Sequence, residues 1–360
     1  MVDSARLTIS VIIPVYNGGE DFHQCLARLS QAAPPPDQVI VVADGDTDGS
    51  WRLAQDFGAT VIRLPTAGGP AKARNLGAKV AQSDILFFID ADVAIYPDTI
   101  GQVLKIFNNE PNLTALIGSY DDAPGAANFL SQYKNLLHHY THQTASEEAF
   151  TFWGACGAIR RDIFIAMGGF EENYRQPCIE DIELGYRLKQ EGYRIKLCKT
   201  LRVKHLKRWG IISLLRADFF YRALPWTAVI LKVRDASPQN CREFISDLNL
   251  KLSSRISVVL VYALLGALVT AYWWSSTVIA IATCVFTLAL LVLNKSVYQF
   301  FYQKRGLLFT IGTIPWHWLY YFYSGLAFAI GIVLHWFKKY LKPRRYFPNL
   351  SILNHYLNLN

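Results

Sequence analysis

The sequence predicts an α/β domain with a mostly parallel sheet, followed by interfacial helices and C-terminal transmembrane helices. Three observations lead to this prediction. Short runs of β-branched and aromatic residues alternate with helix-like segments up to about residue 120, acidic and basic residues divide unequally along the chain, and three long apolar runs lie near the C-terminus. Strands that alternate with helices across short links are typical of right-handed parallel crossovers.

Four short strands and three helices are predicted in the first third of the chain. The strand segments are rich in Val, Ile and Phe, are too short for ordinary helices and are bounded by turn residues. Pro14 is expected to end the first of them. The predicted strands are residues 9–14, 38–42, 60–64 and 85–89, and the predicted helices are residues 21–31, 51–57 and a segment that starts at residue 71.

Carboxylates follow two of these strands. Asp90 and Asp92 come directly after the strand at residues 85–89, and Asp44 opens an acidic loop after the strand at residues 38–42. Open α/β sheets bind ligands at the carboxyl ends of their strands. Asp90 and Asp92 can therefore converge on one hard cation that bridges a diphosphate, whereas the plainer alternative is a solvated turn.

The helical segment that starts at residue 71 is a candidate anion site. Gly68 and Gly69 precede it, and Lys72 and Arg74 lie in its first turns. The unpaired amides at a helix N-terminus attract phosphate groups, and the two cations would add to this attraction. The alternative is an ordinary surface helix with two solvated cations.

A second pair of carboxylates, Glu180 and Asp181, opens a predicted helix that ends near Gly192. Acidic residues at a helix start complement the helix dipole, so the pair by itself does not indicate a site. After this helix, residues 193–197 are predicted to form a strand at the edge of the sheet.

Charged residues are distributed unequally along the chain. Residues 1–198 hold 16 basic and 24 acidic residues, whereas residues 251–360 hold ten basic residues and no acidic one. The overall charge of +8 therefore does not indicate a nucleic-acid partner. The basic residues flank long apolar runs, as they do at the cytoplasmic ends of membrane spans and near anionic headgroups.

Six scattered cysteines without a Cys-x-x-Cys pair suit reduced thiols in the cytosol. The first apolar run, residues 9–15, contains a proline and is too short for a signal sequence with a cleavage site. We therefore expect an integral protein of the plasma or inner membrane whose N-terminal domain stays in the cytoplasm.

The C-terminal half is predicted to associate with the membrane in stages. Nine Lys or Arg residues, one Asp and several aromatic residues occur between residues 199 and 234, a composition typical of interfacial helices. Three apolar runs without Asp, Glu, Lys or Arg follow and are predicted to span the membrane. They are residues 256–274, 277–293 and 307–337, and the last either crosses once as a long tilted span or takes a re-entrant path bent near Pro315.

Seven motifs occur in order along the first 210 residues, at residues 11–17, 44–48, 73–77, 90–92, 153–161, 168–172 and 180–188. Together they resemble the nucleotide-sugar domain of family 2 glycosyltransferases, which have the GT-A fold. Seven motifs in the same order would rarely match one family by chance. The resemblance implies a catalytic domain at residues 1–205. The composition of the remaining chain predicts interfacial helices and a connector at 206–250, a transmembrane region at 251–337 and a basic tail at 338–360.

The resemblance also implies roles for individual residues. Asp181 would be the general base, with Glu180 as the second catalytic candidate. The nucleotide sugar would be bound by Pro14, Asp44, Lys72, Arg74, Asn75 and Asp90, and the acceptor by Trp153, Gly154, Arg208 and Trp209. A divalent cation, magnesium or manganese, would be held by Asp90, Asp92 and His205.

One position departs from the pattern of the processive family members. They carry Gln or Arg three residues before an Arg-Trp pair, whereas this chain has His205 before Arg208 and Trp209. The departure argues against polymer synthesis and offers His205 as a metal ligand or pyrophosphate contact. A structural surface histidine is the alternative, since histidine serves in all these settings.

We therefore expect an inverting, metal-dependent glycosyltransferase that moves a sugar from a nucleoside-diphosphate sugar to a membrane lipid or a lipid-linked acceptor. Two alternatives remain from the sequence. A processive polysaccharide synthase needs a membrane channel, for which three spans are few. A non-enzymatic membrane scaffold would need neither Asp92 nor Asp181.

Overall fold

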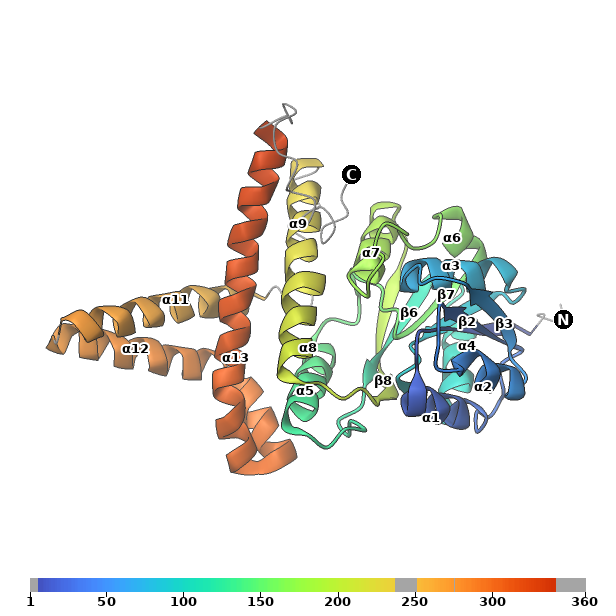
Figure 1. The fold of residues 1–360 in the computed structure, drawn as a ribbon, viewed down its shortest axis with the longest axis horizontal. Helices are drawn as coiled ribbons and strands as arrows, with labels where there is room; N and C mark the ends of the chain where they lie inside the picture. The colour runs from blue at the N-terminus through green and yellow to red at the C-terminus, as the bar shows by residue number, and fades with distance from the viewer. Residues whose placement is uncertain (1–5, 237–250, 275, 341–360) are drawn as a thin grey trace. The chain divides into compact units, whose positions relative to one another are not determined.

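The computed structural model describes residues 6–236, 251–274 and 276–340 (Figure 1). The chain divides into two compact units, the first reaching to Gly210 and the second starting at Ile211. Each unit has its own packing and is described in turn.

Eight strands of the described residues form one mixed sheet in the first unit, in the order β3-β2-β1-β4-β7-β6-β8-β5. The first four in this order are parallel, β7 is antiparallel to both of its neighbours, β6 and β8 are parallel, and β5 closes the sheet antiparallel to β8. The predicted α/β class with a mostly parallel sheet is confirmed. The strands are β1 (Ile9–Val15), β2 (Gln38–Asp44), β3 (Thr60–Leu64), β4 (Ile85–Ile89), β5 (Val93–Ile95), β6 (Ala115–Tyr120), β7 (Cys156–Arg160) and β8 (Ile195–His205).

Helices cover both faces of this sheet. Phe87 of β4 packs with Phe22 and Phe107 on one face, whereas its neighbour Phe88 meets Phe164 and Phe170 on the other. Burial on both faces explains why the central strands are continuous apolar runs. The helices are α1 (Gly19–Leu29), α2 (Ser50–Asp56), α3 (Pro70–Val80), α4 (Thr99–Asn109), α5 (Phe129–Thr144), α6 (Arg161–Ala166) and α7 (Glu180–Gln190).

Three strands differ from the sequence prediction. β1 continues through Pro14 to Val15, and β2 includes Asp44 as its last residue. The larger error concerns β8, which begins at Ile195, has 11 residues and lies between β6 and β5 instead of at the edge. Its basic residues alternate with buried ones such as Val203, so the segment lacks the apolar run that marks an interior strand.

The second unit consists of helices among the residues described. α11 and α12 lie side by side as a hairpin, and α9 packs along α13 (Figure 1). Asn294 at the end of α12 joins three helices, because its amide donates to Ser257 of α11 and accepts from the hydroxyl of Tyr321 of α13. The elements are α8 (Ile211–Arg216), the π-helix η1 (Ala217–Ala223), α9 (Leu224–Ala236), α11 (Leu252–Trp273), α12 (Thr277–Leu293) and α13 (Lys295–Tyr340).

Two of these helices are long and apolar enough to cross a membrane, namely α11 and the Lys295–Phe337 part of α13. α12 is apolar but has only 17 residues. Length and composition are weak evidence of membrane anchoring by themselves. The helical backbone of α13 is interrupted at Gly306, where φ is 79°, and it continues through Pro315, where the sequence suggested a bend.

Candidate active site

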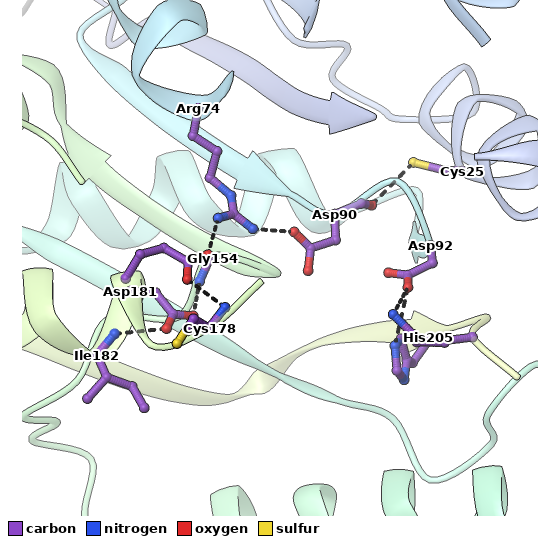
Figure 2. A network of polar contacts seen from close by, with 11 residues as sticks. Cys25, Arg74, Asp90, Asp92, Gly154, Cys178, Asp181, Ile182 and His205 are labelled. Carbon is purple, nitrogen blue, oxygen red and sulfur yellow. Dashed lines mark hydrogen bonds and ion pairs between the residues drawn. The ribbon is translucent and has the colours of Figure 1, made fainter. Parts of the chain in front are cut away.

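Arg74 lies between two carboxylates at the carboxyl end of β4 (Figure 2). Its Nη2 donates to Asp90 Oδ1 at 2.6 Å, and its Nη1 donates to Glu180 Oε1 at 2.8 Å. The side chain extends from α3 and only 4% of the residue is exposed. Burial by itself would lower the pKa of Arg74, but Asp90, Glu180 and Asp181 outweigh it, so the guanidinium stays charged.

Glu180 and Asp181 begin α7 and have different surroundings. Glu180 is 3% exposed, and its second oxygen accepts from the backbone N–H of Cys178 at 2.9 Å. Asp181 is half-buried and accepts from the N–H groups of Gly154 at 3.0 Å and Ile182 at 2.8 Å. Burial, together with the charge of Glu180, raises the pKa of Asp181 to about 7. A carboxylate that exchanges its proton near neutral pH is suited to general base catalysis.

Asp92 meets a second set of partners (Figure 2). His205 Nε2 lies 3.8 Å and Lys207 Nζ 3.5 Å from Asp92 Oδ2. The antiparallel pairing of β5 with β8, which sets Val93 opposite His205, brings these distant segments together. Burial would raise the pKa of Asp92, but His205 and Lys207 outweigh it and hold that pKa below its usual range. Asp92 is therefore an anion at neutral pH.

The Asp44 carboxylate accepts hydrogen bonds from backbone amides of the protein. Its two carboxylate oxygens accept from the N–H groups of Gly68 at 2.7 Å and Gly69 at 2.8 Å, and only 5% of the residue is exposed. The loop before α3 therefore does not present bare amides, as its sequence suggested, because a strand-end carboxylate already binds them. Lys72, by contrast, is exposed on the first turn of α3.

Asn75 also binds protein groups. Its amide nitrogen donates to the Phe170 carbonyl at 2.8 Å and to Glu172 at 3.0 Å, and its oxygen accepts from the Phe170 N–H at 2.8 Å. Pro14 is half-buried within β1. Of the residues predicted to bind the nucleotide, Asp44, Arg74 and Asn75 thus hold the surrounding loops in place.

The predicted acceptor residues divide into two groups. Gly154 donates to Asp181, and Trp153 beside it is half-buried. Arg208 is exposed, whereas Trp209 is buried and its backbone N–H donates to Ser131 Oγ at 2.7 Å. The structure therefore places Gly154 at the candidate base and Trp209 against α5.

A cluster of rings around Trp153 was not anticipated from the sequence. The indole ring lies 4.7 Å from Tyr120, 5.0 Å from His138 and 5.1 Å from His142, measured between ring centroids. Tyr120 also stacks on His205, with centroids 4.3 Å apart and planes at 10°. In the sequence, the four-residue spacing of His138 and His142 places both rings on one face of a helix, and this spacing was the available signal of the cluster.

The donor atoms fit a divalent cation only in part. No group of three or more His, Cys, Asp or Glu side chains in the described part of the chain is placed to hold a metal. Asp92 and His205 nevertheless offer a carboxylate and an imidazole 3.8 Å apart, close enough for both to reach one ion. Asp90 has one oxygen bound by Arg74 instead.

The sequence model of glycosyl transferase family 2 matches residues 10–168. An uncharacterized glycosyltransferase of Haemophilus influenzae is 26% identical over 214 residues, which cover 56% of this chain and 70% of that protein. The O-antigen chain rhamnosyltransferase WbaN of Salmonella anatum is 27% identical over 220 residues, 55% of this chain and 66% of the relative. A dolichol-phosphate mannosyltransferase of Pyrococcus furiosus is 31% identical over 118 residues, 31% of this chain and 33% of the relative.

Among solved structures, the mannosyltransferase PcManGT from Pyrobaculum calidifontis, in complex with GDP-Man and Mn²⁺, matches with a TM-score of 0.60 and 19% identity. The match covers 87% of this chain and 88% of that one, which shows a common fold. Residues 10–168 therefore form a glycosyl transferase family 2 domain, and the chain is a glycosyltransferase with the GT-A fold.

Proposed function

We propose that this enzyme is an inverting glycosyltransferase whose acceptor is a membrane lipid or a lipid-linked sugar, with Asp181 as the general base. One observation carries the chemical part of the proposal. The Asp181 carboxylate is held by two backbone amides, at the active-site end of the sheet, with a pKa of about 7. Glu180 is the weaker candidate because it is 3% exposed and paired with the Arg74 guanidinium, whereas Asp181 is half-buried and bonded only to backbone amides.

The proposed reaction is a single displacement. Asp181 accepts the proton of the acceptor hydroxyl while the hydroxyl oxygen forms a bond to the anomeric carbon of the donor sugar. The bond from that carbon to the diphosphate breaks on the opposite face, and the electron pair leaves with the nucleoside diphosphate. A general base of this kind contributes about 10²–10⁴-fold to the rate, and attack opposite the leaving group inverts the anomeric centre.

Asp92 and His205 are the residues that would hold a divalent cation, either magnesium or manganese. When bound, such an ion neutralises charge on the departing diphosphate. The mixed oxygen and nitrogen donors favour manganese over magnesium, because imidazole suits transition metals better. The Mn²⁺ named with PcManGT is consistent with this preference.

Three features support a membrane-embedded acceptor and a cytoplasmic active site. The second unit contains two helices of sufficient length and apolarity to cross a membrane. If α11 and α12 cross as a hairpin, Lys251, Arg255, Lys295, Lys304 and Arg305 lie on the same side of the membrane, as the positive-inside tendency requires of cytoplasmic ends. Two relatives are named as enzymes of O-antigen chains and of dolichol phosphate.

The test uses the full-length enzyme in vesicles of extracted membrane lipids, supplied with a panel of nucleoside-diphosphate sugars and soluble sugar acceptors. We expect mass spectrometry to show one sugar added to a lipid, with manganese giving the highest rate. Asp181→Asn is the matched control and should form product about 10²–10⁴-fold more slowly. Glycosylation of a soluble sugar together with unmodified lipid would contradict the proposed acceptor.

A further inference from the structure

We propose that Arg74 and Glu180 act as one positioning unit for Asp181, in which the buried guanidinium ties the donor-side Asp90 to the helix that carries the base. This inference rests on the proposed role of Asp181. It assigns Arg74 a task inside the protein in place of the nucleotide contact that its motif suggests.

The surroundings of Arg74 leave no open face for a ligand. Its two Nη atoms are bonded to Asp90 and Glu180, and its Nε is buried without a hydrogen-bond partner. Phe170 packs against the guanidinium with its ring centroid 5.5 Å away. Gly154 lies against it so closely that a Cβ at this position would be 3.0 Å from Arg74 Cζ. The guanidinium is therefore enclosed by protein atoms.

Two routes connect this guanidinium to the base. The first passes through Glu180, which precedes Asp181 in the first turn of α7 and is fixed by Arg74 on one oxygen and by the Cys178 N–H on the other. The second passes through Gly154, whose N–H donates to Asp181 at 3.0 Å while its α-carbon packs on Arg74. A shift of Arg74 would therefore move both the first turn of α7 and the Gly154 amide, and with them the Asp181 carboxylate (Figure 2).

The same unit sets the charge around Asp181. Glu180 from α7 is the anion that faces it, Arg74 from α3 is the cation, and Asp90 at the end of β4 lies beyond Arg74. The loops before β7 and α7 contribute the Gly154 and Cys178 amides to this network. Removal of the cation and removal of the anion must therefore change the proton affinity of Asp181 in opposite directions.

The experiment measures kcat and donor KM against pH for the full-length enzyme in lipid vesicles. We expect Arg74→Gln to raise the pH midpoint of kcat by about one unit and Glu180→Gln to lower it by about one unit. Both should reduce kcat by about 10- to 100-fold, because small misplacements of a reacting group have effects of this size. Donor KM should change less than about threefold, since neither side chain contacts the nucleotide.

Two further variants separate charge from geometry. Arg74→Lys keeps the positive charge but cannot bridge two carboxylates, so its midpoint should stay near that of the native enzyme while kcat falls. Lys79→Gln removes an exposed cation from the last turn of the same helix and should change neither quantity. Circular dichroism and thermal unfolding establish which variants are folded. If a single variant is not, the double variant Arg74→Gln with Glu180→Gln is measured, and its midpoint should stay near that of the native enzyme, because the two shifts cancel, while kcat falls; a midpoint shifted by a full unit would overturn the proposal.

The proposal is overturned if folded Arg74→Gln and Glu180→Gln leave the midpoint unchanged or move it in the same direction. It is also overturned if Arg74→Gln raises donor KM tenfold or more at constant kcat, which would make Arg74 a nucleotide contact. Failure of the base assignment itself has a different signature, because Asp181→Asn would then retain turnover.

Discussion

Asp90 and Asp92 are two positions apart at the end of β4, yet they belong to clusters of different kinds. Asp90 is bonded at 2.6 Å to Arg74, which is 4% exposed and also binds Glu180. Asp92 has His205 and Lys207 at 3.8 and 3.5 Å, beyond ordinary hydrogen-bond length. The first cluster is closed and, in the proposed mechanism, holds the base Asp181 in place, whereas the longer contacts of Asp92 would let its partners rearrange around the proposed cation. One short motif is thus proposed to serve two separate tasks.

The largest expected effect tests the closed cluster. Asp181→Asn keeps the shape of the side chain but cannot accept the acceptor proton, so kcat should fall by about 10²–10⁴-fold while donor affinity is retained. Steady-state rates and nucleotide titration measure the two quantities. A fall of less than about tenfold would transfer the role of base to another residue.

Mutation of the open cluster, which consists of Asp92, His205 and Lys207, should affect the enzyme in a different way. Asp92→Ala is expected to abolish transfer and to remove the dependence of nucleotide binding on manganese or magnesium, because the main anionic ligand is lost. Nucleotide binding by calorimetry with and without the metal gives the comparison. Asp90→Ala should keep the metal dependence, and an equal loss in both variants would mean that the two aspartates share one site.

The two clusters should also differ in how much a mutation in each lowers the free energy of unfolding. Asp90→Ala leaves the buried guanidinium of Arg74 with one carboxylate fewer, which costs about 3 kcal/mol in comparable buried pairs. Asp92→Ala removes only long contacts, to the buried His205 and the half-buried Lys207, and should cost less than about 1 kcal/mol. Thermal unfolding of both variants without nucleotide measures the difference. Equal melting temperatures would contradict the distinction between closed and open clusters.

The last comparison concerns the pH dependence of stability. The pKa of Asp181 is raised from 3.8 to about 7 in the folded protein, so the folded state retains a proton that the unfolded chain releases above pH 4. The stabilisation from this proton is full below pH 4 and is lost as the pH rises through 7. Asp181→Asn avoids the loss, and its advantage should grow between pH 4 and 7 by at most about 1.4 kcal/mol per pH unit.

Melting temperatures of the native enzyme and Asp181→Asn at pH 5 and pH 8, without metal or nucleotide, test this prediction. The variant should be relatively more stable at pH 8 than at pH 5. An unchanged difference in melting temperature between the two pH values would show that Asp181 ionises at its ordinary pKa in the folded protein.

The sequence by itself determined the parts of this protein that depend on consecutive residues. The strands at residues 60–64 and 85–89 and the helix at residues 277–293 have the predicted limits, because apolar runs and turn residues specify them locally. The ordered motifs were also sufficient to indicate the family. Strands rich in polar residues, such as β8, were misjudged because their burial depends on neighbours that the local pattern does not reveal.

Only the tertiary structure decided which side chains meet. Arg74 and Glu180 are 106 positions apart, and their contact depends on α3 and α7 converging at the end of β4. His205 reaches Asp92 because β5 pairs with β8, and Asp44 binds the loop before α3 because β2 ends beside it. A motif names the chemical groups at a site, but strand order determines the partners of each group. For this reason the partners of Arg74 and Asp44 follow from the fold and not from their motifs.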